Sequence, residues 1–181
     1  MRDNFYVNPE GDLAIEAIAR AQSIKRWHMV DTTRVQSLAE HSANVATLAY
    51  YICISSPQAY FGSPADAALA GLLHDIPESF TGDIPSHTKR ELLGIDELEN
   101  ELTPAVLIRP MNENMANLIK LCDLADGIRF IRVHGADATA QWACDGLSDQ
   151  LKNRESVVSS LWPSHVKEHV MAKIHYYIFN T

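Results

Sequence analysis

The sequence predicts an all-α protein, and two observations support this prediction. Apolar residues recur at helical spacing along most of the 181-residue chain. No segment shows the convincing alternation of apolar and polar residues that a half-buried β-strand would require. The sequence contains no internal repeat and no low-complexity segment. Because a chain of this length suits one packed domain, residues 1–181 are expected to form a single-domain helical bundle.

A first helix is expected from Pro9 to Lys25, with one apolar face toward the core. This face is expected to contain Leu13, Ala17 and Ile24, with Ile15 and Ile18 beside them. A cation and a large aromatic residue, Arg26 and Trp27, follow the end of the helix. They fit either a core tryptophan beside a solvated arginine, or a phosphate-binding guanidinium beside a flat pocket wall.

Ser37 and Glu40 match a capping box, with serine at the N-cap and glutamate three residues later. The second helix, which they begin, should end near Ile54. Its apolar stripe includes Val45, and one turn earlier the stripe reaches His41. A histidine in this position is either a hydrogen-bonded core residue or a ligand, and the ligand role requires other ligands to converge on it.

A loop over 55–63 precedes a third helix, which Pro64 opens at its first position. This helix is rich in alanine and leucine and should be buried. Pro77 should end it near Asp75, because the residue before a proline disfavours helical geometry. At such an end, His74 and Asp75 can both turn toward one point, whereas neighbours within a helix point about 100° apart.

Ser86 can cap a fourth helix from His87 to Glu101, whose first turn would then contain Lys89 and Arg90. Basic residues are mildly unfavourable at a helix N-terminus, where the dipole attracts anions. They are therefore either solvated charges or residues that bind an anionic ligand.

A long helix is expected over 112–133, and it places Asp123 on its buried stripe. A buried carboxylate needs a cationic partner, which is either a neighbouring lysine or arginine or a metal ion. Asp126 lies close by and competes with Asp123 for this role.

Two further helices are expected over 136–147 and 151–178. Pro163 should kink or split the second, because proline lacks the amide hydrogen that a helix interior uses. The apolar faces of these helices are expected to contain Trp142, Val158, Leu161 and Val170.

The composition argues against several classes of protein. The formal net charge is −8, which argues against nonspecific binding to a nucleic-acid backbone. No apolar run approaches the roughly 18 residues of a membrane span, and the polar N-terminus lacks the apolar region of a signal peptide. Cys53, Cys122 and Cys144 fit buried thiols in a reducing compartment. We therefore expect a cytoplasmic protein that binds neither a nucleic-acid polymer nor a membrane.

Three of the expected helices supply candidate ligands for a divalent metal ion. These ligands are His41, His74, Asp75 and Asp123. Two imidazoles and two carboxylates are enough to hold one ion while leaving positions for water and substrate. Such mixed ligands accept zinc, cobalt or manganese, among other metals. This pattern of His, His-Asp and Asp resembles the HD-domain phosphohydrolase superfamily.

The surrounding motifs narrow this resemblance to the YfbR-type 5′-deoxynucleotidase branch. The motifs are Lys25-Arg26-Trp27, Ala39-Glu40-His41-Ser42, His74-Asp75 with Glu78, Thr81-Gly82-Asp83-Ile84-Pro85, and Asp123. The resemblance runs from about Lys25 to Asp126. Within the branch, the run 25–28 and the stretch 74–91 look like those of phage dATP triphosphohydrolases, and the compact length agrees.

The resemblance implies a role for each matching residue. The residues that match the metal ligands are His41, His74, Asp75 and Asp123. Glu78 matches the acid that orients or deprotonates the attacking water, and Asp83 matches a second acid near the phosphate. Arg26 matches the phosphate-binding arginine, and Trp27 matches the residue beside the sugar, where crowding could exclude a 2′-hydroxyl. Independently of the resemblance, we expect Lys89 to reach the distal phosphates of a triphosphate.

These assignments predict a metal-dependent phosphohydrolase of deoxynucleotides, with dATP favoured and deoxyadenosine plus phosphates as products. A general 5′-deoxynucleotidase that acts on monophosphates is the alternative within the same class. A non-catalytic HD domain that binds a nucleotide and a purely helical interaction module are alternatives of other classes. The expected cofactor is one divalent ion, with a possible second, weaker ion on the substrate phosphates. Related enzymes assemble, so a homo-oligomer, either a dimer or a hexamer, is expected.

Overall fold

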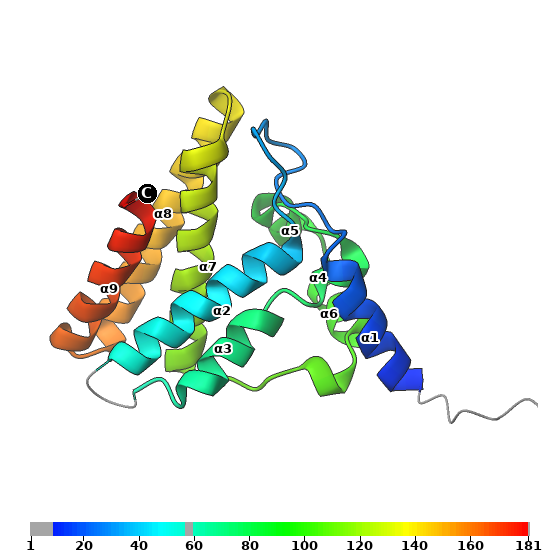
Figure 1. Cartoon of the computed structure of the whole chain (residues 1–181), viewed down its shortest axis with the longest axis horizontal. Coiled ribbons are helices and arrows are strands. Elements are labelled where there is room, and N and C mark those ends of the chain that lie inside the picture. The colour runs from blue at the N-terminus through cyan, green and yellow to red at the C-terminus, as the bar shows by residue number, and fades with distance from the viewer. Residues whose placement is uncertain (1–8, 57–59, 181) are drawn as a thin grey trace, which may run out of the picture.

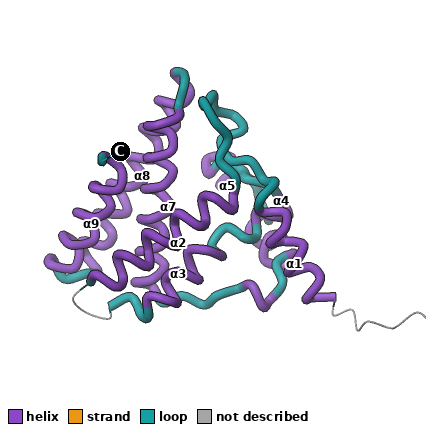
Figure 2. Tube along the Cα trace, in the orientation of Figure 1, coloured by secondary structure: helices purple, strands orange, loops and turns teal. Residues whose placement is uncertain are grey.

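The computed structural model describes residues 9–56 and 60–180, and these residues form helices and loops without a β-strand (Figures 1 and 2). The all-α prediction is thereby confirmed. The polar N-terminal residues 1–8 and Pro57 of the expected loop lie outside the described residues. The elements are α1 (Pro9–Ala21), α2 (Leu38–Ser55), α3 (Pro64–Leu73), α4 (Glu78–Thr81), α5 (Ser86–Glu91), α6 (Ile95–Leu102), the 3-10 turn η1 (Ala105–Leu107), α7 (Glu113–His134), α8 (Ala138–Leu161) and α9 (Ser164–Phe179).

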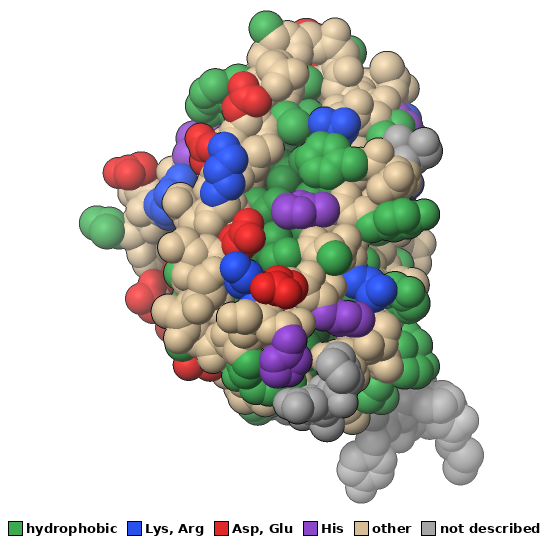
Figure 3. Space-filling view, turned by 90° about the vertical axis from the view of Figure 1, so that its left-hand side faces the viewer, with side chains coloured by type: hydrophobic (Ala, Val, Ile, Leu, Met, Phe, Trp, Pro, Cys, Tyr) green, Lys and Arg blue, Asp and Glu red, His purple; other side chains and the backbone are tan. Residues whose placement is uncertain are grey.

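The helices form two sides joined by a central pair (Figure 1). Helix α7 packs against α8 and α9 on one side, α2 packs against α3 and α7 in the middle, and α1 packs against α4 on the other side. One apolar core lies among α2, α3, α7, α8 and α9, and a second lies beneath α1. Figure 3 faces the side of α9, where apolar side chains gather around a hollow with charged side chains at its rim. None of the described helices combines the length and apolarity of a membrane span.

Ser37 begins α2 as predicted, and its hydroxyl accepts a hydrogen bond from the backbone N–H of Glu40 at 3.1 Å. The second hydrogen bond of the expected capping box, from the backbone N–H of Ser37 to the side chain of Glu40, is not formed. The Glu40 carboxylate instead accepts a 2.9 Å hydrogen bond from Nη1 of Arg34. The predicted register of the helix is correct, because His41 and Val45 are both fully buried.

Gly71 allows α3 to approach α2 closely. A Cβ atom at this position would lie 2.7 Å from the Cα of Ala46, a distance that real Cβ contacts avoid. The approach brings the ring centroid of His74, one turn further along, to 5.3 Å from that of His41. Helix α3 ends just before His74, so its predicted end is correct to within two residues.

The segment after α3 differs from the prediction. The expected connection contains the one-turn helix α4, and the expected fourth helix is divided into α5 and α6. Gly94 separates these two helices with a left-handed backbone, φ 78°. Ser86 is the first residue of α5 and not its side-chain cap, and Lys89 and Arg90 lie in the last turn of α5. The prediction that Lys89 and Arg90 lie in a first turn is therefore wrong. Their positions do not indicate an anionic ligand, because the C-terminus of a helix favours positive charge.

The predicted apolar face of α1 is also wrong in part. The helix ends at Ala21, and its buried residues are small: Ala14, Ala17 and Ala21. The larger apolar residues Leu13, Ile15 and Ile18 are exposed. Small side chains let α1 lie close to the segment that follows α3, and helical periodicity alone did not distinguish this face from its neighbour.

The C-terminal helices agree with the prediction in number and differ in their boundaries. Asn112 caps α7, whose bounds match the predicted helix to within one residue. Helix α8 runs unbroken through 147–151, where a break was expected, and Pro163 separates α8 from α9 as predicted. Val158 and Val170 are buried, whereas Trp142 and Leu161 are exposed, contrary to expectation.

Candidate metal centre

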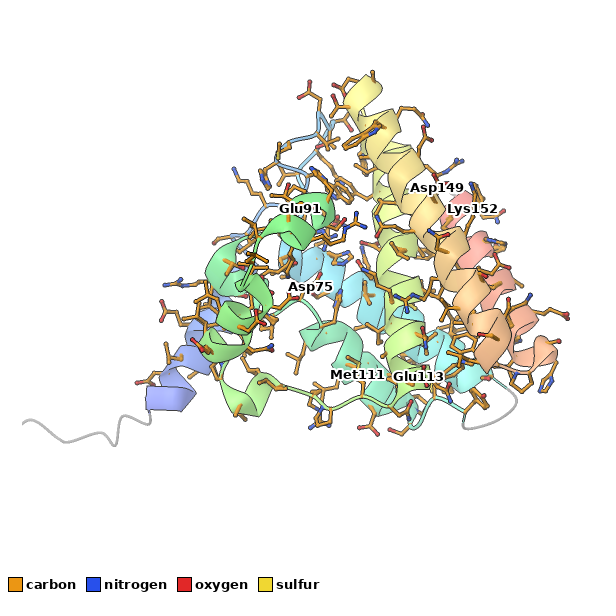
Figure 4. All side chains as sticks on the ribbon, turned by 180° about the vertical axis from the view of Figure 1, so that it is seen from behind. Asp75, Glu91, Met111, Glu113, Asp149 and Lys152 are labelled. Atoms are coloured by element: carbon orange, nitrogen blue, oxygen red, sulfur yellow. The ribbon has the colours of Figure 1, made fainter. Side chains whose placement is uncertain are left out.

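The structure brings together the four residues that the sequence singled out as metal ligands. They are His41 on α2, His74 and Asp75 after α3, and Asp123 on α7. One ligand atom from each residue lies within 4.8 Å of all the others. Figure 4 shows Asp75 in the middle of the molecule, where the chain leaves α3.

Both imidazoles point their Nε2 atoms toward this cluster because their Nδ1 atoms are held from behind. The Nδ1 of His41 lies 2.7 Å from Oδ2 of Asp126, and the Nδ1 of His74 lies 2.8 Å from the backbone oxygen of Gly71. A carboxylate and a carbonyl only accept hydrogen bonds, so each Nδ1 carries a hydrogen, and in the neutral imidazole each Nε2 presents a lone pair. Neither Nε2 has a hydrogen-bond partner within the described part of the chain.

These lone pairs face carboxylate oxygens at short range. The Nε2 of His41 lies 3.2 Å from Oδ1 of Asp123, and the Nε2 of His74 lies 3.1 Å from Oδ2 of Asp75. Two acceptors this close repel each other unless a proton or a metal ion lies between them. In the protein without metal, burial and the charge of Arg26 lower the pKa of His41, but the adjacent carboxylates of Asp123, Asp126 and Asp75 outweigh them and raise it to about 10, so that a proton occupies Nε2. The donor set of two nitrogens and two carboxylates fits a divalent ion such as zinc.

The two competing carboxylates of α7 occupy different positions. Asp123 directs Oδ1 toward the cluster, while its Oδ2 accepts a 2.7 Å hydrogen bond from Nζ of Lys120. Burial opposes its ionisation, but the charge of Lys120 and the close approach of His41 hold the pKa of Asp123 below its usual range. Asp126 lies behind His41, on the side away from the cluster. Asp123 therefore has the neighbouring lysine as a partner and also faces a group of side chains that could hold a metal ion.

Arg26 projects into the same site from the loop after α1. Its Nη1 donates a 3.1 Å hydrogen bond to Oδ2 of Asp75, and its Nε lies 3.9 Å from Oδ1 of Asp83. Burial lowers the pKa of Arg26, but the charges of Asp83 and Asp75 outweigh this effect and raise it, so the guanidinium stays charged. Its Nε finds no hydrogen-bond partner among the described residues. A buried cation with a free donor is suited to an incoming oxyanion.

Trp27 forms a fixed wall beside Arg26. Its φ of 63° is unusual for a residue other than glycine. The indole ring stacks on Phe130 with centroids 6.3 Å apart, and its Nε1 donates a 2.9 Å hydrogen bond to Oε1 of Gln36. Its other neighbour is Gly127, where a Cβ would lie 3.4 Å from the ring. Trp27 thus packs against the core, as the first interpretation required, but Arg26 beside it is buried and not solvated, which favours the interpretation as a pocket wall beside a phosphate-binding guanidinium.

Glu78, the first residue of α4, is buried beside the cluster, and its Oε2 has no hydrogen-bond partner within the described residues. Burial and the charges of Asp75 and Asp83 raise the pKa of Glu78 to about 9, against the effect of nearby cations. Lys89 places its Nζ 3.7 Å from Oε1 of Glu78 and 2.6 Å from Oε2 of Glu99. The site thus has crowded carboxylates whose charge a bound cation would compensate.

Sequence reasoning missed the residues that hold these groups in place, which are Gln36, Asn44, Glu99 and Tyr177. Asn44 carries a weak sequence signal, because it follows His41 by three residues and shares its helix face. Tyr177 carries none, since it lies on α9 and only the tertiary fold brings it to α7.

An all-helical fold with a partly buried cluster of His, His-Asp and Asp defines the HD class of phosphohydrolases. In agreement, the fold matches a solved structure described as the Cyanophage S-2L HD phosphohydrolase (DatZ) bound to dA and one catalytic Zn²⁺ ion. The TM-score is 0.77 and the identity is 30%, over 92% of this chain and 96% of that chain.

Residues 15–125 match the family described as 5′-deoxynucleotidase YfbR-like, and the chain belongs to this family. It is 32% identical to a dATP triphosphohydrolase of Salmonella phage PMBT28, over 80% of this chain and 79% of the relative. It is also 32% identical to a dATP triphosphohydrolase of Cyanophage S-2L, over 84% of this chain and 87% of the relative. The resemblance inferred from the motifs is thereby confirmed.

Proposed function

We propose that this protein is a metal-dependent phosphohydrolase that cleaves dATP to deoxyadenosine and phosphates, with dADP and dAMP as further substrates. The observation that carries the proposal is the pair of unpartnered imidazole nitrogens facing two carboxylates in a partly buried cluster. Two relatives named dATP triphosphohydrolase, and the dA bound in the phage structure, support this choice of substrate. Exposed Leu13, Ile15 and Ile18 on α1 are consistent with assembly of the single catalytic domain into a dimer or hexamer.

The proposed metal ligands are His41, His74, Asp75 and Asp123. Zinc suits their two nitrogens and two oxygens, and the neighbouring structure contains one catalytic Zn²⁺ ion. Cobalt or manganese would also be accepted, and a second, weaker ion could accompany the substrate phosphates. An ion held there supplies an activated water and polarises a phosphoryl oxygen.

The remaining side chains would act directly on the substrate. Arg26 would clamp phosphate oxygens in fork geometry, using the Nε that lacks a partner. Glu78 would orient or deprotonate the attacking water, and Asp83 would protonate the leaving 5′ oxygen or position water. Trp27 would stand beside the sugar and exclude a 2′-hydroxyl. Lys89 would contact distal phosphates, which requires it to exchange part of its present contact with two carboxylates.

Glu78 must be ionised to accept a proton, yet its pKa without metal is raised to about 9. After burial, the largest cause is the negative charge of Asp75. A bound cation that compensates Asp75 would remove this cause and lower the pKa of Glu78 toward neutrality. The same ion that completes the cluster would therefore prepare Glu78 for its role.

The test is a nucleotide panel with the zinc-loaded protein, using dATP, dADP, dAMP and ATP and identifying every product. We expect dATP to yield deoxyadenosine and phosphates, and ATP to react more slowly. The matched control is Glu78→Gln, which should keep zinc and lose most turnover and so exclude a contaminating phosphatase. A zinc-loaded wild type that releases nothing from any deoxynucleotide would favour a non-catalytic nucleotide-binding domain and refute the proposal.

A general 5′-deoxynucleotidase is the second candidate, because the matching family carries that description and a relative from Vibrio atlanticus, 32% identical over 40% of this chain, is named so. It predicts rapid release of orthophosphate from several deoxynucleoside monophosphates and little reaction with dATP. The same panel separates the two activities.

A further inference from the structure

Asp126 is a buried carboxylate that the proposed chemistry does not use, and it lies directly behind His41. It is 2% exposed and accepts four hydrogen bonds. Its Oδ2 accepts from Nδ1 of His41 at 2.7 Å and from Nε2 of Gln36 at 2.8 Å. Its Oδ1 accepts from the hydroxyl of Tyr177 at 2.8 Å and from Nδ2 of Asn44 at 3.0 Å.

These contacts fix the orientation of each group in the network. The indole of Trp27 only donates, so Oε1 of Gln36 must face it, and the amide nitrogen must then face Asp126. Asp126 in turn only accepts, so the hydrogen of His41 must lie on Nδ1. A directed series of hydrogen bonds therefore links the wall residue Trp27 to the imidazole whose Nε2 faces the cluster.

The network draws on elements that are distant in sequence. Asn44 and His41 come from α2, Asp126 from α7 and Tyr177 from α9. Tyr177 lies beyond the segment 15–125 that matches the family. The C-terminal helix thus contributes a hydrogen bond to the group that orients a metal ligand.

We propose that Asp126, held by Tyr177, Gln36 and Asn44, is a positioning residue that keeps His41 in its Nδ1–H form and presents Nε2 to the metal ion. The inference rests on the proposed metal centre. Outer carboxylates that orient a ligating histidine commonly contribute 10- to 100-fold in metal affinity. An effect of this size is therefore expected here.

Asp126→Asn is the most direct substitution because it preserves shape and removes the charge. If the new amide directs its NH₂ group at His41, Nδ1 must accept, and Nε2 then carries the hydrogen and no longer binds metal. If it directs its oxygen at His41, the NH₂ group meets the amide donor of Asn44, and the hydroxyl of Tyr177 must accept where it now donates. Either arrangement should weaken zinc binding by about 10- to 100-fold.

Tyr177→Phe is the milder variant, since it removes one hydrogen bond without changing the ring. It should weaken zinc binding roughly two- to tenfold, as expected for the loss of one hydrogen bond. Tyr176→Phe is the matched control, because the neighbouring Tyr176 is 69% exposed. It should bind zinc as the wild type does.

The measurement is competition for zinc between each full-length variant and a chromophoric chelator, with the visible spectrum of the cobalt-substituted protein as a second readout. Circular dichroism establishes whether each variant is folded. The cobalt spectrum should change in Asp126→Asn, which a purely structural role for Asp126 would not cause.

Zinc affinity and cobalt spectra equal to wild type in a folded Asp126→Asn would overturn the inference while leaving the proposed function intact. If Asp126→Asn does not fold, Tyr177→Phe decides, and equality with Tyr176→Phe overturns the inference. Failure of the wild type itself to bind zinc or cobalt would instead refute the proposed metal centre.

Discussion

Replacing Gly71 with alanine should separate the two helices that carry the histidine ligands. The new Cβ would lie 2.7 Å from the Cα and 2.8 Å from the N of Ala46. Ordinary contact begins near 3.4 Å, so α3 must retreat from α2 by about 0.7 Å. Both obstructing atoms belong to the backbone, so no side-chain rotation can relieve the clash. Overpacking of this kind costs about 1–3 kcal/mol.

The same shift should weaken the metal centre, because His74 follows Gly71 by one turn and His41 lies on the opposing helix. Metal–ligand distances tolerate deviations of about 0.2 Å, which is well below the expected displacement. We therefore expect zinc affinity to fall about tenfold or more. The assay is urea unfolding in the presence of a chelator, combined with a separate zinc competition titration.

Gly146→Ala is the matched control, since Gly146 also lies within a helix and a Cβ there meets no atom within 4 Å. Both substitutions carry the same gain of about 1 kcal/mol in helix propensity, so their difference isolates the clash. Gly71→Ala should be less stable than Gly146→Ala by about 1–3 kcal/mol. Equal stability and equal zinc affinity in the two variants would refute the close-approach argument.

Three further predictions address the site itself. Without metal, the pKa of Glu78 is about 9 in the folded protein and 4.5 in the unfolded chain. Between these two pH values the folded protein binds more protons than the unfolded chain, so the free energy of unfolding should fall as the pH rises from 4.5 to about 9. Glu78→Gln should lack this contribution. Unfolding titrations in the presence of a chelator that show the same pH dependence for Glu78→Gln and the wild type would contradict the prediction. Zinc at 100 times its Kd should stabilise the wild type by about 2.7 kcal/mol, and calorimetry should show no such increase in His74→Ala. Trp27→Ala should lower the preference for dATP over ATP by about 10- to 100-fold in kcat/KM, and an unchanged ratio would remove Trp27 from sugar selection.

The limits of sequence reasoning are clearest around the fourth expected helix and in α1. The apolar and charged pattern over 87–101 was compatible with one helix, and only the backbone shows that Gly94 divides it. In α1, two adjacent faces were apolar, and the choice of the alanine face depended on how closely the chain after α3 approaches. Such choices depend on contacts between distant segments, which local periodicity does not contain.

The sequence by itself determined the helical class and the candidate ligand set. Capping residues, prolines and apolar spacing act within a few residues of the chain. His41, His74 and Asp75 lie in short sequence motifs that can be recognised without the tertiary structure. Only the tertiary structure separated Asp123, which faces the cluster, from Asp126, which supports His41 from behind. Both carboxylates lie on one side of the same helix, so their roles follow from what packs against α7.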